Sequence, residues 1–162
     1  MWKKQGLIFS CDFYGTGYAQ DAFIDIIDDK TWRIYYSART KKVVSLPHMI
    51  DVEAGNPMNI LKIYKEPLFR PGRIGTFDDS GITMTSIVNV NDNKYLYYCG
   101  WNKRVSVPYA LSIGVAILKK NGTSFEKMFE GPIMDRTKYN PIAVSAPFVI
   151  YDEGLFKMWY IS

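Results

Sequence analysis

The chain of 162 residues lacks the features that mark several classes of protein. It has one histidine and two cysteines without a CxxC pair, so we predict no metal site and buried free thiols. No run of about 18 apolar residues occurs, which predicts that no helix spans a membrane. The segment Met1–Gly6 lacks the apolar stretch of a secretory signal, so we expect a cytoplasmic location.

An excess of one charge is also missing. Twenty Lys and Arg against 16 Asp and Glu leave a net charge of +4, and the basic residues are scattered along the chain. A nucleic-acid-binding surface usually carries a dense basic stripe. We therefore predict no nucleic-acid partner, and no motif in the chain predicts a cofactor.

Aromatic residues are abundant: they make up 15% of the chain, and hydrophobic residues make up 48%. This composition argues against disorder. The length suits one ordinary domain rather than two large ones.

The aromatic residues recur with a fixed period. Tyr36, Tyr98 and Tyr160 are 62 residues apart (98 − 36 = 160 − 98 = 62) within similar apolar segments. A second apolar run precedes each tyrosine, and polar turns separate the two runs at 28–30, 91–93 and 152–154. Each unit is therefore predicted to be a β-hairpin.

Two further strands are predicted in each period. Large residues alternate through Leu111–Ile117, Asn121-Gly122 then provides a turn, and residues 123–129 form the next strand. Ser45–His48 parallels Ser106–Tyr109, which predicts a loop or rim position for His48.

Four antiparallel strands per period predict the blades of a β-propeller. A sandwich of eight to ten strands is the alternative, but a sandwich does not need a repeat of this length. The predicted fold class is all-β, with about two and a half blades of a five-bladed propeller. We expect residues 1–162 to form one partial domain with repeats at approximately 18–80, 81–142 and 143–162, the last incomplete.

Several motifs resemble one known group of proteins. They are 33–39 (RIYYSAR), 75–82 (GTFDDSGI), 97–102 (YYCGWN), 131–133 (GPI), 145–149 (SAPFV) and 158–160 (MWY). Together they resemble bacterial glycosidase-like proteins of the five-bladed β-propeller superfamily that includes glycoside hydrolase families 43, 32 and 130. The resemblance runs from about Gly15 to Ser162 and implies a link to polysaccharide metabolism. The chain departs from it by having Asp21-Ala22 where a proline is usual.

Two acidic positions are candidates for catalysis. Glycoside hydrolysis commonly uses two carboxyl groups that flank the scissile bond. Asp78 and Asp79 directly precede a strand that would line the channel of a propeller, and we favour Asp78 as the catalytic residue, although a self-capping turn is an equal alternative. Asp21 lies before the first such strand, and the resemblance implies a general base in that blade; a structural aspartate at the strand edge is the alternative. Acids in the hairpin turns are expected to face solvent.

The candidate substrate-binding residues lie near the predicted ends of strands. They are Arg39, Arg73, Asp79, Trp101, Asn102, Tyr109 and Arg136. Guanidinium groups bind carboxylates, phosphates and sugar hydroxyls, and Trp101 and Tyr109 could stack on a sugar ring. Surface salt bridges are the alternative for each arginine.

Two functions remain open. One is a glycosidase-like enzyme that acts on a carbohydrate. The other is a non-catalytic carbohydrate-binding or assembly module, or an inactive propeller fragment. Because a partial propeller leaves strand edges open, we also expect a homodimer or a second chain that completes the ring.

Overall fold

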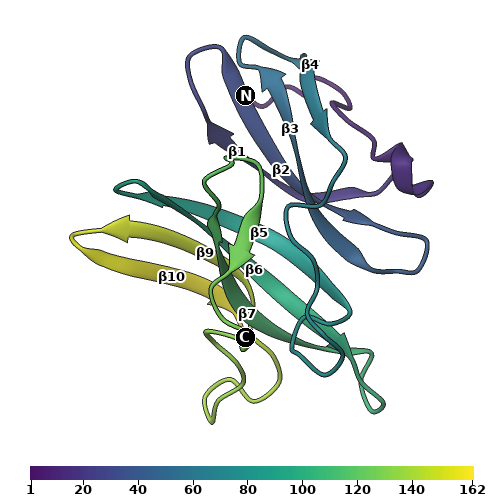
Figure 1. Ribbon diagram of the computed structural model, residues 1–162, viewed down its shortest axis with the longest axis vertical. Helices are drawn as coiled ribbons and strands as arrows, with labels where there is room; N and C mark the ends of the chain where they lie inside the picture. Colours follow the sequence, from purple (N-terminus) through teal and green to yellow (C-terminus); the bar gives the residue numbers. More distant parts are fainter.

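The computed structural model describes residues 1–162 and is built from β-strands, as predicted (Figure 1). The strands are β1 (Ala19–Ile26), β2 (Thr31–Arg39), β3 (Ser45–Glu53), β4 (Asn56–Tyr64), β5 (Gly81–Val90), β6 (Asn93–Lys103), β7 (Tyr109–Leu118), β8 (Phe125–Lys127), β9 (Ser145–Asp152) and β10 (Leu155–Ile161). A short 3-10 helix, η1 (Asp12–Tyr14), precedes them. No helix is long and apolar enough to cross a membrane.

The strands form two antiparallel units of four and a final hairpin. Strands β1 to β4 pair in chain order, as do β5 to β8, and β9 pairs with β10. One parallel pair, Ser45 with Gly81, joins the two units at β3 and β5. These are propeller-like blades: two have four strands, and the third has its first hairpin (Figure 1).

Local hydrogen bonds explain the turns. Asp28 Oδ1 accepts bonds from the backbone N–H groups of Lys30 and Thr31, each 2.8 Å long, and closes the β1–β2 turn. Between β7 and β8, Asn121 Oδ1 accepts bonds from two backbone N–H groups and Gly122 has φ +70. The acidic residues of the hairpin turns face solvent, as expected.

Apolar residues fill the spaces between the blades. The largest cluster joins the first two blades and includes Tyr35, Met49, Ile82 and Tyr98. A smaller cluster, centred on Val88, Tyr97, Val115 and Val149, holds the β9–β10 hairpin against the second blade. The N-terminal segment covers the other face of the first blade through Phe9, Cys11 and Tyr14. Each blade therefore packs face to face on its neighbour.

Each of the three first strands of a blade is interrupted by a β-bulge. The pairing register shifts between Gln20 and Phe23 in β1, between Met84 and Ser86 in β5, and beside Ala146 in β9. Asp21 and Ala146 have positive φ values of 55 and 47 at these bulges. The three bulges lie opposite the repeated tyrosine segments, and they redirect side chains away from the regular strand alternation.

The predicted loop position of His48 is wrong. His48 is fully buried in β3, where it pairs with Tyr36 and its Nε2 lies 2.9 Å from the Tyr14 hydroxyl. The residue in the same register of the second blade is Gly114, the partner of Tyr98, rather than Tyr109. The β6–β7 and β2–β3 ladders each have nine pairs, but they are placed differently around the repeated tyrosine: the β6–β7 ladder continues five residues past Tyr98 (103 − 98), against three past Tyr36 (39 − 36) for β2–β3.

Both cysteines are buried free thiols, as the sequence predicts. Cys11 packs in the cluster under the N-terminal segment, and Cys99 lies in β6. Burial raises the pKa of each thiol to about 11, so both are protonated at neutral pH and are poor nucleophiles.

Candidate functional site

The three bulges meet at one pocket of about 520 Å³, which we call the bulge pocket. Its lining residues are Asp21, Arg39, Val43, Thr83, Thr85, Cys99, Trp101, Lys103, Arg104, Pro108, Tyr109, Leu111, Ser145 and Ala146. They come from all three blades, although the blades are far apart in the sequence. The bulges thus create a concave site from segments that repeat along the chain.

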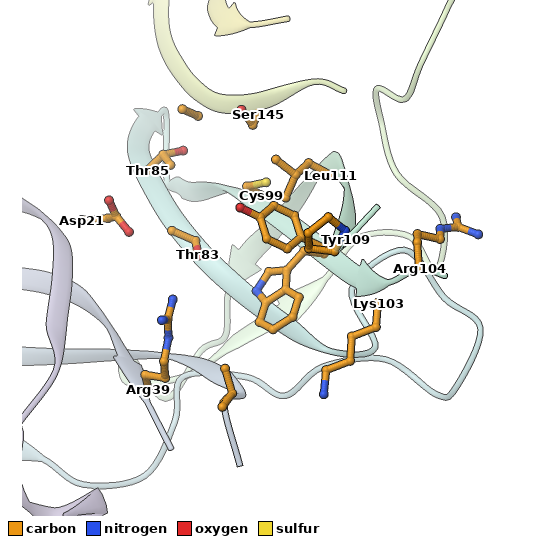
Figure 2. Close-up of a pocket in the computed structure, with 14 residues that line it drawn as sticks. Asp21, Arg39, Thr83, Thr85, Cys99, Lys103, Arg104, Tyr109, Leu111 and Ser145 are labelled. Carbon is orange, nitrogen blue, oxygen red and sulfur yellow. The ribbon is translucent and has the colours of Figure 1, made fainter. Parts of the chain in front are cut away.

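Asp21 supplies the carboxylate of the pocket (Figure 2). It lies in the bulge of β1, and its φ of 55 is a conformation that aspartate tolerates better than most residues. Desolvation by the surrounding protein raises the pKa of Asp21, and the positive charge of Arg39 opposes that shift. A raised pKa keeps the acid protonated over a wider pH range, which suits proton donation.

Two aromatic rings form the apolar part of the pocket. Trp101 in β6 and Tyr109 in β7 meet edge to face, with ring centroids 6.1 Å apart. Gly81 makes room for the indole, because an added Cβ there would lie 2.4 Å from Trp101 Nε1. Both rings lie on the β6–β7 hairpin, and the pairing that continues two residues further past Tyr98 than past Tyr36 carries Tyr109 to the pocket.

Hydroxyl groups line the pocket and also join the blades. Thr85 Oγ1 donates to the Pro147 carbonyl over 2.7 Å and Ser86 Oγ donates to the same oxygen over 3.1 Å, so β5 is tied to β9. Ser37 Oγ accepts a bond of 3.0 Å from the backbone N–H of Met84 between the first two blades. These buried links hold the three bulges in one arrangement.

The structure places Asp78 outside the pocket. Its side chain is fully buried, and Asp78 Oδ2 lies 2.5 Å from Lys127 Nζ. Asp78 Oδ1 also accepts bonds from the Gly72 N–H and the Thr76 hydroxyl. The neighbouring Phe77 ring fits against Gly100 and Gly114, where an added Cβ would come within 2.5 and 2.7 Å of it. This packing fastens the loop before β5 to the second blade.

Four other candidates also lie away from the pocket. Asp79 accepts bonds from the Gly75 N–H and the Ser80 hydroxyl within its own turn. Arg73 forms an exposed ion pair with Glu130 at 3.2 Å. Asn102 donates to the Thr76 carbonyl, and Arg136 is exposed in the loop before β9.

The bulge pocket brings together Asp21, Arg39, Trp101 and Tyr109 from the sequence-based candidates. Sequence reasoning missed Lys103, Arg104, Thr83, Thr85 and Ser145. Thr85 and Pro147, the neighbour of the Ser145–Ala146 bulge, follow the 62-residue repeat, but this spacing does not by itself mark Thr85 or Ser145 as a pocket residue. No group of three His, Cys, Asp or Glu side chains is placed to hold a metal ion.

The chain shares its propeller-like fold with solved structures of glycoside hydrolases. A structure of glycoside hydrolase family 130, described as mannoside phosphorylases and glycoside hydrolases that target β-1,2 mannosidic linkages in Candida mannan, matches with a TM-score of 0.64. It is 19% identical, and the match covers 99% of this chain and 51% of that protein. A glycosyl hydrolase from Bacteroides ovatus matches with a TM-score of 0.54 and 14% identity, covering 90% of this chain and 62% of the hydrolase.

Two relatives are more similar to the chain in sequence than these structures are, but neither has a described activity. Two proteins of Mycobacterium tuberculosis, from two strains and both named uncharacterized, are 37% identical over 164 residues. The match covers 99% of this chain and 54% of each relative, so the chain spans about half the length of these relatives. No family model matches the chain.

Proposed function

We propose that this chain is part of a glycosidase-like protein that binds a carbohydrate in the bulge pocket. The observation that carries the proposal is the convergence of three repeated bulges on one cavity that holds an acid, an arginine and two aromatic rings. Aromatic faces pack on the C–H surfaces of sugars, while the carboxylate and guanidinium bind hydroxyl groups. The shared fold with glycoside hydrolases supports this choice over other ligands.

A binding experiment with two tyrosine variants tests the proposal. Tyr109 lines the pocket and is 53% exposed, whereas Tyr139 is 79% exposed in the loop before β9. Calorimetry against a panel of neutral and acidic oligosaccharides should show binding that Tyr109→Ala weakens about tenfold. Tyr139→Ala should leave the affinity unchanged. The proposal would be contradicted if no glycan of the panel binds, or if both variants lose the same amount of affinity.

Hydrolysis is the more specific function, and we propose Asp21 as its acid–base residue. Asp21 has a raised pKa and lies in the pocket, whereas Asp78 is closed off by Lys127. Hydrolysis commonly requires a second carboxyl group. In this proposal it comes from outside the 162 residues; otherwise the chain belongs to a binding module without turnover.

An activity assay separates these two alternatives. Aryl glycosides and oligosaccharides are offered to a full-length relative that carries the equivalent of Asp21→Asn, Asp78→Asn or Asp92→Asn. Turnover should fall by at least about 100-fold in the first variant. The exposed turn residue Asp92 serves as the control, and Asp78→Asn should reduce stability instead. Turnover that is unchanged by Asp21→Asn would remove this residue from catalysis, and binding without hydrolysis would favour the binding module.

A role in bacterial polysaccharide metabolism, and a place in the cytoplasm, are parts of the same proposal. We also infer that the open face of the β9–β10 hairpin is covered by further propeller strands, from a second copy or from another polypeptide segment. That face carries Phe148, Trp159 and Ile161, which are 57%, 56% and 64% exposed.

A further inference from the structure

The charges of the bulge pocket are unequal. Arg39, Lys103 and Arg104 line it, against the single carboxylate of Asp21. None of the three cations forms an ion pair within the protein, although seven ion-pair contacts occur elsewhere. The pocket therefore has a positive potential that the chain itself does not neutralise.

Arg39 carries an unpaired donor. It is the last residue of β2, and its guanidinium packs over the ring of Tyr18 at 5.7 Å from the centroid. Its Nε–H is buried and has no hydrogen-bond partner in the protein. A buried donor without a partner is costly, so a ligand acceptor that reaches it would remove the cost. Figure 2 shows the Arg39 guanidinium directed into the pocket, on the same side as Asp21.

The other two cations come from a feature that the first blade lacks. Lys103 ends β6 and Arg104 begins the turn, and both lie beyond the register at which β2 ends, because pairing continues two residues further past Tyr98 than past Tyr36. The same extension carries Tyr109, whereas Trp101 occupies in the second blade the register that Arg39 has in the first. In Figure 2, Tyr109 lies between Arg39 on one side and Arg104 on the other. Aromatic rings and cations are thus combined in one local elaboration of the blade.

We propose that the carbohydrate bound in the bulge pocket is an acidic sugar, whose carboxylate is held by Arg39 with Lys103 and Arg104 around it. This inference rests on the proposed function and makes its substrate class specific. A guanidinium matches a carboxylate with two parallel hydrogen bonds. A hydroxyl group of a neutral sugar would accept a hydrogen bond from Arg39 but would leave the excess positive charge of the pocket without a partner. The aromatic rings favour a sugar over a bare inorganic anion, because an inorganic anion has no apolar face to pack on them.

The experiment uses oligosaccharides that differ only in charge. Oligomers of glucuronate, galacturonate and mannuronate are titrated into the protein, together with the same oligomers after reduction of their carboxyl groups. We expect an acidic oligomer to bind about tenfold more tightly than its reduced form. The preference should weaken as salt concentration rises, because exposed cations contribute to it.

Variants test the residues that carry the preference. Arg39→Gln should weaken binding of the acidic oligomer much more than binding of the reduced one, so that the preference for the acidic form becomes smaller. Lys103→Gln/Arg104→Gln, on the exposed hairpin, is the second variant if Arg39→Gln fails to fold. Arg73→Gln is the matched control, because that arginine pairs with Glu130 outside the pocket. An equal loss of acidic-oligomer binding in the control would overturn the assignment to Arg39.

The outcomes separate this inference from the proposed function. Tyr109-dependent binding with no preference for the acidic form would overturn the inference and leave carbohydrate binding intact. Failure of both forms to bind would overturn both. Arg39-dependent binding of inorganic phosphate or a mononucleotide, with no binding of acidic oligosaccharides, would also overturn both.

Discussion

At the scale of the residue, Asp21 bears two costs that a purely structural residue would avoid. Its backbone has φ 55, and desolvation raises its pKa, although Arg39 opposes the shift. A raised folded-state pKa favours the protonated form, so its contribution to stability is present at low pH and is lost as pH rises through the folded pKa. Asp21→Asn should therefore increase the free energy of unfolding at pH 7 and leave it unchanged near pH 3, since asparagine also tolerates this backbone conformation.

Urea denaturation at the two pH values measures this effect, which solvent screening keeps small. Asp28→Asn is the control, because its expected change in stability at pH 7 has the opposite sign. Backbone N–H groups, that of Lys30 first, lower the pKa of Asp28, so its ionised form stabilises the fold at neutral pH. The Asp28 variant should lose stability at pH 7. A loss in both variants would mean that Asp21 is as structural as Asp28.

Gly81 gives a second prediction at this scale. Gly81→Ala places a Cβ 2.4 Å from the Trp101 indole, which must move. We expect a loss of about 1–3 kcal/mol in the free energy of unfolding, from the overpacked contact, and weaker glycan binding. Gly131→Ala is the control, because an added Cβ there meets nothing within 4 Å. Denaturation curves and Trp fluorescence titrations measure both effects; an unchanged Gly81→Ala variant would show that the indole position is not tightly held.

The sequence predicts some residues of the pocket and not others for a physical reason. Asp21, Trp101 and Tyr109 stand out because acids and aromatic residues near strand ends are recognisable by type, and their role in binding stays a prediction. Thr85 and Ser145 are ordinary strand residues until a bulge redirects them, and a bulge leaves no distinct residue pattern here. Likewise, no short local motif predicts the ion pair between Asp78 and Lys127, because the two residues are far apart in the sequence.

At the scale of the element, the loop before β5 is held by one buried and one exposed ion pair. Asp78 is fully buried beside Lys127, whereas Arg73 and Glu130 are 79% and 81% exposed. Asp78→Asn leaves the Lys127 charge uncompensated and should cost about 3 kcal/mol of unfolding free energy. Glu130→Gln should cost less than about 1 kcal/mol, because exposed pairs contribute little. Chemical denaturation compares them, and similar losses would contradict the anchoring role of Asp78.

The hairpins show which strands the residue pattern of the sequence can predict. Alternation and polar turns predict strands close to β1–β2, β5–β6 and β9–β10, because each is a local structure with its own turn. The β6–β7 extension escaped prediction, since similar prolines at 47 and 108 suggested a common register. In the structure, Pro47 lies within β3 and Pro108 precedes β7, because the two ladders of equal length are shifted by two residues relative to their tyrosines.

At the scale of the whole molecule, the β9–β10 hairpin presents an apolar face with no partner in the chain. Phe148 and Trp159 pair across the strands with ring centroids 6.2 Å apart, and both are more than half exposed, while Val149 beneath them packs on the second blade. Such a face beside the free edge of β10 favours association. Light scattering of the 162-residue chain should show a mass that rises with concentration, and Phe148→Thr/Trp159→Lys should return it to a monomer. Ile74→Lys, at a lone loop residue that is 98% exposed, should not. If the unmodified chain is a monomer at every concentration, this face needs no partner in solution.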